Sequence, residues 1–216
     1  MSFCVLIHNG KDVFFMQNTK TKTLVECAVM VALATVLSYI KIYRLPWGGS
    51  ITLLSMLPVI VFSIRHGIKW GLACSGLNAL LQLGQGIIGG LFGWGLTPAM
   101  LIGCILLDYL LPYFVLGFSG MFRNKGQYGW IAGMITTILI RIVFHVLSGV
   151  VIWESAGELW SGFSTDNSVI YSLLYNCAYM LPEMIFTIIG AIALFNIPQT
   201  AKFFPHDKSG TPAYNG

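Results

Sequence analysis

Six apolar blocks, separated by short segments rich in polar residues and glycine, organise the chain. They run over about residues 23–43, 51–64, 67–88, 96–118, 128–153 and 168–197. At about 1.5 Å of rise per residue, a helix over most of these blocks reaches the roughly 30 Å of a bilayer's hydrocarbon core. The second block reaches only about 20 Å and contains Pro58, so it needs neighbouring helices or a locally thin bilayer. The pattern predicts an all-α membrane protein, a six-transmembrane-helix bundle.

Composition and cysteine spacing exclude several classes of protein. Of the 216 residues, 56% are hydrophobic and 9% are charged, and the mean hydropathy is +0.77. A soluble domain usually has about 25% charged residues, so a water-soluble enzyme, a nucleic-acid-binding domain and a disordered chain fit poorly. The five cysteines form no Cys-x-x-Cys pair, and four of them lie inside apolar blocks. We therefore expect contact with a lipid bilayer, no nucleic acid partner, and no metal site or disulfide framework.

The basic residues sort to one side of the six predicted spans. Nine of the twelve lysines and arginines fall in the N-terminal segment, two alternate turns and the C-terminal tail. These nine are Lys11, Lys20, Lys22, Arg65, Lys69, Arg123, Lys125, Lys202 and Lys208. Under the positive-inside rule, both termini are cytoplasmic. We therefore expect a cytoplasmic N-terminal extension over 1–22, a six-helix transmembrane substrate-binding domain over 23–198 and a cytoplasmic tail over 199–216.

Apart from Lys41 and Lys69 near the span ends, a few ionisable side chains fall within the predicted spans, where they are costly unless they face a partner or a cavity. They are Glu26, Asp108, Arg141, His145 and Glu183. Glu26 lies within a turn of the cytoplasmic end, where it can snorkel or pair with a lysine. Arg141 and His145 are four residues apart and share one helix face. Arg141 either neutralises Asp108 or Glu183 or contacts a ligand, and the spacing leaves both readings open.

Aromatic and hydrogen-bonding residues gather in the outer half of the predicted bundle. They are Trp47, Trp94, His145, Trp153, Trp160, Tyr171, Tyr175 and Asn176. A belt of Trp and Tyr at the membrane interface explains isolated members of this set, whereas their clustering with Asp108 favours a binding pocket. Aromatic faces suit a flat or cationic heterocycle, and a carboxylate and an amide provide directed hydrogen bonds in an apolar cavity.

The sequence lacks the motifs of several enzyme classes. Neither a GxxxxGK[ST] phosphate-binding loop nor an HExxH zinc motif occurs. The run Gly117-Phe118-Ser119-Gly120 matches the short GxSG of intramembrane serine proteases, for which His145 would be the base. However, Ser119 lies at the cytoplasmic end of its span, and His145 lies about 26 Å from that end by helical rise. A Ser–His pair needs a separation of about 3 Å, so we expect no enzymatic activity and no cofactor.

Small residues on the first span offer a surface for close helix packing. Ala28 and Ala32 form a small-xxx-small pair, with Ala34 nearby. Such a pair lets two helix backbones approach each other closely. It serves either packing inside this bundle or docking to another membrane subunit, and the spacing does not choose between them.

Five stretches of the sequence, by their order and spacing, resemble the thiamine-specific substrate-binding (S) components of energy-coupling factor (ECF) transporters, the ThiT/YuaJ group. They are ECAVMVALA at 26–34, GGSITLLSMLP at 48–58, LDY at 107–109, the stretch 144–153 from FH to IW, and YSLLYN at 171–176. The resemblance covers about residues 23–197. It implies the ECF S-component fold, a six-helix membrane bundle that holds the vitamin near its outer face.

The resemblance implies ligand-binding roles for particular side chains. Trp153 stacks on a ring of thiamine, and His145, Tyr171 and Asn176 contact or orient the ligand. Thiamine is thus expected as the transported ligand and not as a cofactor.

Other site positions depart from the family pattern. Asp108 takes the place of a family glutamate, beside the matching Tyr109, and its side chain is one methylene shorter. Trp47 falls in a capping loop where the family often has an aromatic residue. Asn78 lies near a position where some members have a tryptophan, and Trp94 can substitute for a family tyrosine. These departures weaken the assignment of thiamine, rather than a related heterocycle, as the ligand. They leave the assignment as an S component unchanged.

The resemblance also implies partners in a bacterial plasma membrane. Release of the vitamin into the cell requires a transmembrane coupling subunit and two ABC-type ATPase subunits, which use ATP and supply the phosphate-binding loops that this chain lacks. Ala28 and Ala32 match the small-residue motif that docks to the coupling subunit. Two alternatives remain: an S component for another small vitamin or heterocyclic precursor, and a structural or assembly membrane protein or intramembrane enzyme that binds no such ligand.

Overall fold

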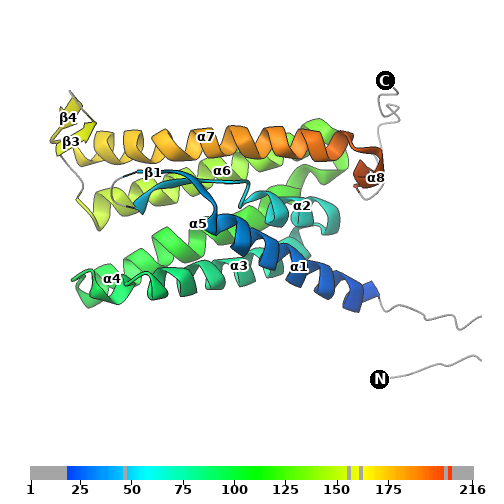
Figure 1. Cartoon of the computed structure of the whole chain (residues 1–216), viewed down its shortest axis with the longest axis horizontal. Coiled ribbons are helices and arrows are strands. Elements are labelled where there is room, and N and C mark those ends of the chain that lie inside the picture. Colours follow the sequence, from blue (N-terminus) through cyan, green and yellow to red (C-terminus); the bar gives the residue numbers. More distant parts are fainter. Residues whose placement is uncertain (1–18, 46–47, 155–156, 161–162, 202–203, 206–216) are drawn as a thin grey trace, which may run out of the picture.

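The fold is an elongated bundle of helices with two short β-hairpins (Figure 1). The computed structural model describes residues 19–45, 48–154, 157–160, 163–201 and 204–205. Its uninterrupted long helices are α1 (Thr19–Tyr39), α3 (Ile68–Ile88), α6 (Gly126–Val151) and α7 (Ser168–Asn196). A further long helical stretch comprises α4 (Pro98–Cys104), η3 (Ile105–Leu110), α5 (Leu111–Phe114) and η4 (Val115–Lys125). The short helices are α2 (Leu57–His66), η2 (Leu91–Gly93) and α8 (Pro198–Ala201).

Three of the described helical segments are long and apolar enough to cross a membrane: Lys20–Tyr39, Pro98–Val151 and Ser168–Asn196. The 54-residue middle segment makes two passes, because the backbone leaves helical geometry at Phe122 and turns at Gly126, where φ is +64°. The indole N–H of Trp130 closes this turn by donating to the carbonyl of Arg123 at 2.8 Å. α3 is also 21 residues long, and it contains Lys69, Asn78, Gln82 and Gln85. The structure thus recovers the predicted six-helix plan, with α2 as a short sixth member.

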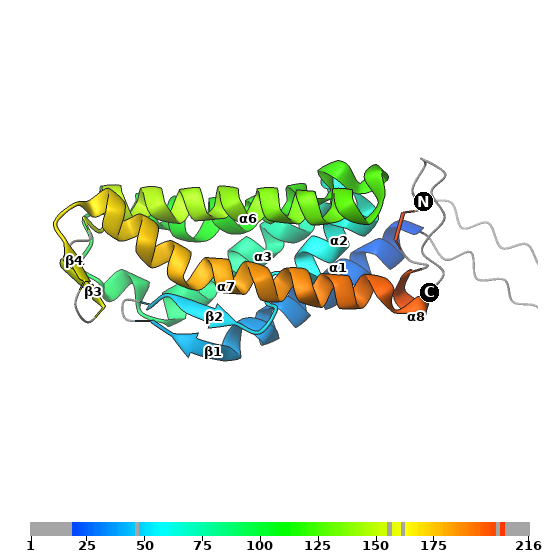
Figure 2. The ribbon, with the colours of Figure 1, turned by 90° about the horizontal axis from the view of Figure 1, so that it is seen from above.

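The described chain starts and finishes at the same end of the bundle, as an even number of passes requires. α1 begins and α8 lies at the right-hand end in Figures 1 and 2. The α2–α3 turn and the η4–α6 turn lie at this end too, and they carry Arg65, Lys69, Arg123 and Lys125. We call this the basic end. The α3–α4 and α6–α7 connections lie at the opposite end.

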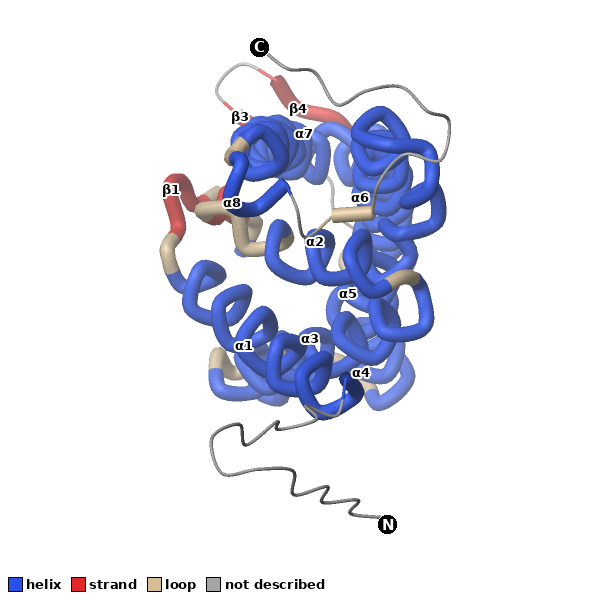
Figure 3. Tube along the Cα trace, turned by 90° about the vertical axis from the view of Figure 1, so that its right-hand side faces the viewer, coloured by secondary structure: helices blue, strands red, loops and turns tan. Residues whose placement is uncertain are grey.

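The short helix α2 is enclosed by the other helices, as the view along the bundle shows (Figure 3). Every residue from Pro58 to Ile64 is buried. A helix that is apolar on all sides is stable only in such surroundings. Neighbouring helices therefore supply the environment that the short second block needs, and its 10-residue length is no obstacle.

Two β-hairpins correct the helix boundaries predicted from the apolar blocks. α1 ends at Tyr39 instead of continuing to residue 43, because Lys41–Arg44 forms strand β1, which pairs antiparallel with β2 (Ser50–Thr52). The second block therefore becomes helical only at Leu57, with Pro58 in the first turn, where its missing N–H costs nothing. A second hairpin, β3 (Gly157–Trp160) with β4 (Phe163–Thr165), connects α6 to α7. The predicted helix boundaries were therefore wrong at these two connections, while the fold remains a helical bundle.

A π-helical turn interrupts the fourth predicted span. η3 (Ile105–Leu110) is a π-helix, and Pro112 follows it in the first turn of α5. Proline has no N–H and its ring crowds the carbonyl four residues earlier, which here belongs to Asp108. A wider helical turn relieves that conflict. The sequence thus places Asp108 within a local widening of the helix.

Small residues let the helices at the basic end pack closely. The hydroxyl of Ser63 donates to the carbonyl of Gly117 at 2.6 Å and accepts the N–H of Gly120 at 3.0 Å. A Cβ added at Gly117 would lie 2.8 Å from the backbone carbonyl of Gly71. These contacts join α2, α3 and η4 through backbone atoms, so no larger side chain fits between them.

Gly117→Ala is expected to destabilise the fold by about 1–3 kcal/mol, because its methyl group would collide with backbone atoms of α3. Gly76→Ala is the matched control, since its Cβ would meet only the Phe114 ring at an ordinary 3.5 Å. We expect that control to be neutral or slightly stabilising. Thermal unfolding in detergent measures both, and equal melting temperatures for the two variants would contradict this account of the packing.

Candidate functional site

The carboxylate of Asp108 is the centre of a hydrogen-bonded cluster in the half of the bundle away from the basic end. Its Oδ2 accepts from the Ser148 hydroxyl at 2.6 Å, the Trp153 indole N–H at 3.2 Å and the Cys104 thiol at 3.3 Å. Nδ1 of His145 lies 3.3 Å from its Oδ1. The π-helical turn and the end of α6 therefore build this cluster together.

The charge of Asp108 has no fixed cationic partner among the described residues. The one ion pair that it forms there is with His145, an imidazole that is charged only when protonated. The carboxylate is also only 20% exposed. Three donors occupy Oδ2, but a carboxylate accepts about four hydrogen bonds, so Oδ1 retains capacity for another donor. The arrangement suits a ligand that brings a positive charge or an N–H group.

Trp153 presents an indole that is held in place but remains open to solvent. Its N–H is fixed by Asp108, and its ring meets the Trp94 ring edge to face, with centroids 5.6 Å apart and planes at 61°. Even so, 39% of the residue is exposed. An indole held in one orientation with part of its surface free can stack on a planar heterocycle at little entropic cost.

A row of tyrosines follows one face of α7. Tyr171 and Tyr175 stack at 6.3 Å, and Tyr175 meets Tyr179 edge to face at 5.8 Å. α7 packs along α6, the helix that carries His145 and Ser148 of this cluster. The hydroxyl of Ser172, on α7, donates to the carbonyl of Val146 at 3.0 Å and ties α7 to α6. The row therefore borders the Asp108 cluster.

The amide of Asn176 is engaged within α7 itself. Its Nδ2 donates to the carbonyl of Ser172 at 2.8 Å, and its Oδ1 accepts the Tyr179 hydroxyl at 2.8 Å. Asn176 is 5% exposed. In this structure it orients Tyr179, and direct contact with a ligand would require the exchange of one of these bonds.

The β1–β2 hairpin is anchored on α7 at two points. The N–H of Gly49 donates to the Tyr175 hydroxyl at 2.9 Å. At the base of the hairpin, Thr52 hydrogen-bonds to the carboxylate of Glu183, and the Ser55 hydroxyl donates to the same oxygen at 3.3 Å. Glu183 is 2% exposed, so these bonds satisfy an otherwise isolated buried acid. The hairpin thus depends on the same helix that carries the tyrosine row.

Several buried polar atoms of the bundle have no hydrogen-bond partner among the described residues. They are Nε2 of His145, Nε and Nη1 of Arg141, Oδ1 of Asn78 and Nε2 of Gln85. Buried polar groups in native proteins are nearly always hydrogen-bonded, so such atoms indicate a bound ligand or water. The guanidinium of Arg141 lies over the Tyr113 ring, 4.2 Å from its centroid, and forms no ion pair with Asp108 or Glu183 in the described residues. Arg141 therefore makes no direct ion pair with either acid in the described residues, and both readings, neutralisation across a longer distance and contact with a ligand, stay open.

The remaining predicted residues lie apart from the Asp108 cluster. Tyr109 points toward α3, where its ring packs against Gly86 and joins an apolar cluster with Leu91. Trp47 lies outside the described residues. Ala28 and Ala32 lie on the exposed face of α1. They do not pack inside this bundle.

Glu26 pairs with two basic residues at the end of α2. Its carboxylate contacts Arg65 in an ion pair and lies 3.1 Å from Nε2 of His66. The enclosed α2 ends beside the first turns of α1, which brings these side chains together.

The GxSG run serves helix packing. Ser119 is fully buried, donates to the carbonyl of Leu116 at 2.7 Å and lies 2.9 Å from the Thr137 hydroxyl. His145 instead faces Asp108. The two members of the supposed catalytic pair therefore belong to different clusters.

The sequence analysis missed two hydrogen-bond donors to the Asp108 carboxylate, Cys104 and Ser148. A periodic signal exists for both: Cys104 is four residues before Asp108, and Ser148 is three residues after His145, so each shares a helix face with a residue already singled out. Small side chains within an apolar run give no other indication of their role.

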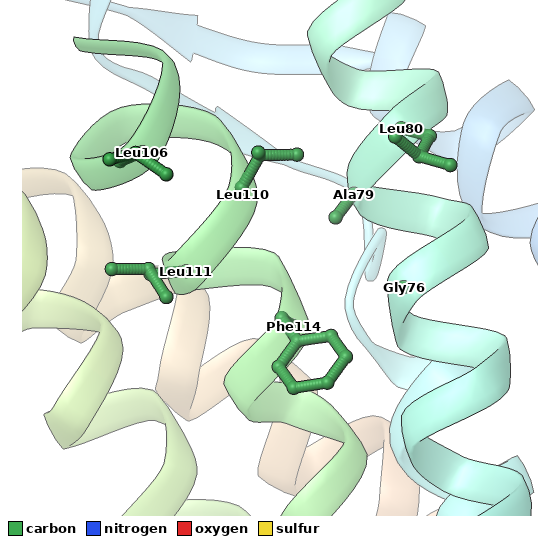
Figure 4. A pocket seen from close by; sticks show the side chains of 7 residues that line it. All are labelled: Gly76, Ala79, Leu80, Leu106, Leu110, Leu111 and Phe114. Atoms are coloured by element: carbon green, nitrogen blue, oxygen red, sulfur yellow. The ribbon is translucent and has the colours of Figure 1, made fainter. Parts of the chain in front are cut away.

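An apolar hollow lies between α3 and the stretch formed by η3 and α5 (Figure 4). It has a volume of about 380 Å³ and is lined by Gly76, Ala79, Leu80, Leu106, Leu110, Leu111 and Phe114. None of these side chains donates or accepts a hydrogen bond. A polar cation has no partner there, so the hollow is not a second version of the Asp108 site.

Comparison with known proteins agrees with this geometry. The family model described as thiamine transporter protein (Thia_YuaJ) matches residues 24–203. The thiamine transporter ThiT of Bacillus subtilis (strain 168) is 31% identical over 199 residues, which cover 83% of this chain and 93% of that protein.

Solved structures show the same fold. A structure of ThiT from Listeria monocytogenes superposes with a TM-score of 0.64 at 26% identity and covers 87% of this chain and 100% of its own. The S component of a bacterial ECF transporter superposes with a TM-score of 0.53 at 17% identity, over 82% of this chain and 97% of its own, which supports the fold alone. With most of its length matched, this membrane protein belongs to the Thia_YuaJ family of thiamine transporter proteins.

Proposed function

We propose that the chain is the substrate-binding membrane subunit of an ECF-type importer and that it captures thiamine at the outer face of the bacterial plasma membrane. The observation that carries the proposal is the Asp108 carboxylate, which lies beside the open indole of Trp153 without a lysine or arginine partner in the described residues. Thiamine combines a cationic thiazolium with an aminopyrimidine, so it brings both the charge and the N–H donors that this site lacks.

Roles for the site residues follow from their contacts. Trp153 stacks on one ring of thiamine, and Oδ1 of Asp108 accepts from its amino group or faces its positive charge. Nε2 of His145 has no hydrogen-bond partner among the described residues, so it can bind the ligand. Tyr171 completes the aromatic wall, and Tyr109 supports the π-helical turn from behind.

The hairpin acts as a lid over the bound vitamin. Gly48 has a φ of +97°, a backbone conformation that only glycine adopts without strain. The next residue, Gly49, lies directly against Tyr175, where a larger side chain would not fit. Closure at this tip, with Trp47 as a capping residue, excludes water from the site.

Titration of the purified protein with thiamine, followed by tryptophan fluorescence, tests the proposal. We expect saturable quenching at nanomolar concentration, since Trp153 and Trp94 form one side of the site. Quenching only by a different vitamin or heterocyclic precursor would replace thiamine with that ligand. The absence of a response to every heterocycle would contradict substrate binding.

Import requires partners, for which we propose a transmembrane coupling subunit and two ABC-type ATPase subunits. The support is the exposed pair Ala28 and Ala32, which forms a shallow strip between the larger exposed side chains Val25 and Val29. A strip of small residues permits close approach of another helix. We further propose that 23–198 forms the membrane domain and that 1–22 and 199–216 lie in the cytoplasm, on the side of the basic end.

Tyr175→Phe is expected to speed thiamine dissociation by about threefold to tenfold, because it removes the acceptor of the Gly49 N–H and leaves the ring in place. Stopped-flow fluorescence measures the rate. Tyr128→Phe is the control, since Tyr128 is 90% exposed and far from the hairpin in the fold. A dissociation rate equal to that of the unmodified protein would contradict the lid.

A further inference from the structure

The basic end contains a groove between two turns that the thiamine site does not use. The groove has a volume of about 410 Å³ and lies between the α2–α3 turn and the η4–α6 turn. Its polar lining comes from His66, Lys69, Arg123 and Asn124, with Trp70 beside them. Every ionisable side chain in this lining is basic.

Two of the cations in this groove are uncompensated. Neither Lys69 nor Arg123 forms an ion pair with any carboxylate in the described part of the chain. The nearby acid, Glu26, is already occupied by Arg65 and His66. Arg123 is also partly buried, and a partly desolvated guanidinium without an anionic partner is costly. The groove therefore has a net positive charge that nothing in the described chain neutralises.

The walls of the groove are fixed before any ligand arrives. A Cβ at Gly67, where φ is +84°, would lie 2.6 Å from Nη1 of Arg123, so the guanidinium rests directly on this turn. The Trp130 indole holds the carbonyl of Arg123, and Ser63 joins α2 to the N–H of Gly120. A cation held in this way loses little side-chain entropy when it binds an anion.

The chemistry and position of the groove point to a phosphate. A planar guanidinium with a nearby ammonium matches the oxygens of a phosphate ester, which accept in pairs. Trp70 is a residue type that prefers the headgroup region, and the exposed Ile68 lines the same groove and offers apolar surface to an acyl chain. Basic clusters at this depth attract anionic lipids.

We propose that this groove binds the phosphate of an anionic phospholipid headgroup, with Arg123 and Lys69 as the principal contacts. Binding at this point fixes the two turns of the basic end against the membrane surface. The proposal is independent of the ligand at Asp108, because the two sites lie in different halves of the bundle.

Native mass spectrometry of the full chain, released from micelles with added lipid, tests this. We expect retention of phosphatidylglycerol in preference to phosphatidylcholine, and we expect Lys69→Gln with Arg123→Gln to weaken that retention at least about tenfold. Lys41→Gln with Arg44→Gln is the matched control, which removes the same charge from the exposed strand β1. It should retain the lipid as the unmodified protein does.

Three outcomes would overturn the proposal. Equal retention of the two lipids by the unmodified protein would remove the preference for anionic headgroups. Equal losses in the two double variants would indicate a general charge effect instead of this groove. Displacement of phosphatidylglycerol by inorganic phosphate at matched concentration would identify a soluble phosphate, not a lipid, as the ligand. Thermal unfolding of each variant in detergent verifies that the bundle is folded.

Discussion

Asp108→Asn is expected to weaken thiamine binding by about tenfold to a hundredfold. The substitution keeps the size of the side chain and removes the charge that His145, Ser148 and Trp153 surround. A hydrogen bond to a charged group contributes about 1.5–3 kcal/mol, which corresponds to that range of affinity. The amide would also turn an N–H toward donors that now point at an acceptor. Fluorescence titration of the purified variant measures the change.

Two further carboxylate variants define the reason for that loss. Asp108→Glu lengthens the side chain by one methylene, and we expect it to keep an affinity within about threefold of the original, since the charge remains and only the reach changes. Glu158→Gln removes a charge from the exposed strand β3 and should change nothing. If Asp108→Asn binds thiamine as tightly as the unmodified chain, the carboxylate is not part of the binding site.

Ala28→Leu combined with Ala32→Leu is expected to abolish thiamine uptake while binding stays within about twofold. Both alanines lie on the exposed face of α1, away from the buried side chains of Cys27 and Val31. Two isobutyl groups would keep the backbone of a docking helix at a distance, which removes the packing that drives association in lipid. Uptake in cells that contain the coupling and ATPase subunits, together with titration of the purified variant, measures both properties.

Ala132→Leu is the matched control, because Ala132 is an exposed alanine on α6. It should leave uptake and binding unchanged. A loss of binding in the α1 double variant would mean that the alanines pack inside the bundle, which their exposure contradicts. Unchanged uptake would mean that a different surface of the chain docks to the coupling subunit.

The pattern of apolar blocks predicted the helices because lipid requires long apolar helices, and this requirement leaves a clear signal. The prediction from apolar blocks failed where the chain leaves the apolar core of the bundle. Residues Lys41–Arg44 read as the end of a helix, yet they pair with Ser50–Thr52, because a turn at Gly48 brings the two segments together. Burial of α2 on all sides was equally hidden, since a short apolar run has the same composition whether it faces protein or lipid.

The candidate site was predicted in part for a physical reason as well. Charged and amide groups are rare within lipid, so Asp108, His145 and Asn176 stood out from the sequence. Two features could not be predicted: that a π-helical turn before Pro112 carries Asp108, and that Arg141 lies over the Tyr113 ring. Such contacts depend on side-chain packing between helices, which periodicity along one helix does not encode.

Isothermal titration of the purified protein and its Trp153→Ala variant with thiamine is the most direct test of the central claim. Phe92→Ala, which removes an aromatic side chain that is 63% exposed near Trp94, is the control. The account predicts one thiamine per chain, an affinity loss of about tenfold to a hundredfold for Trp153→Ala, and no change for Phe92→Ala. Unchanged affinity in the Trp153 variant would contradict the assignment of this site.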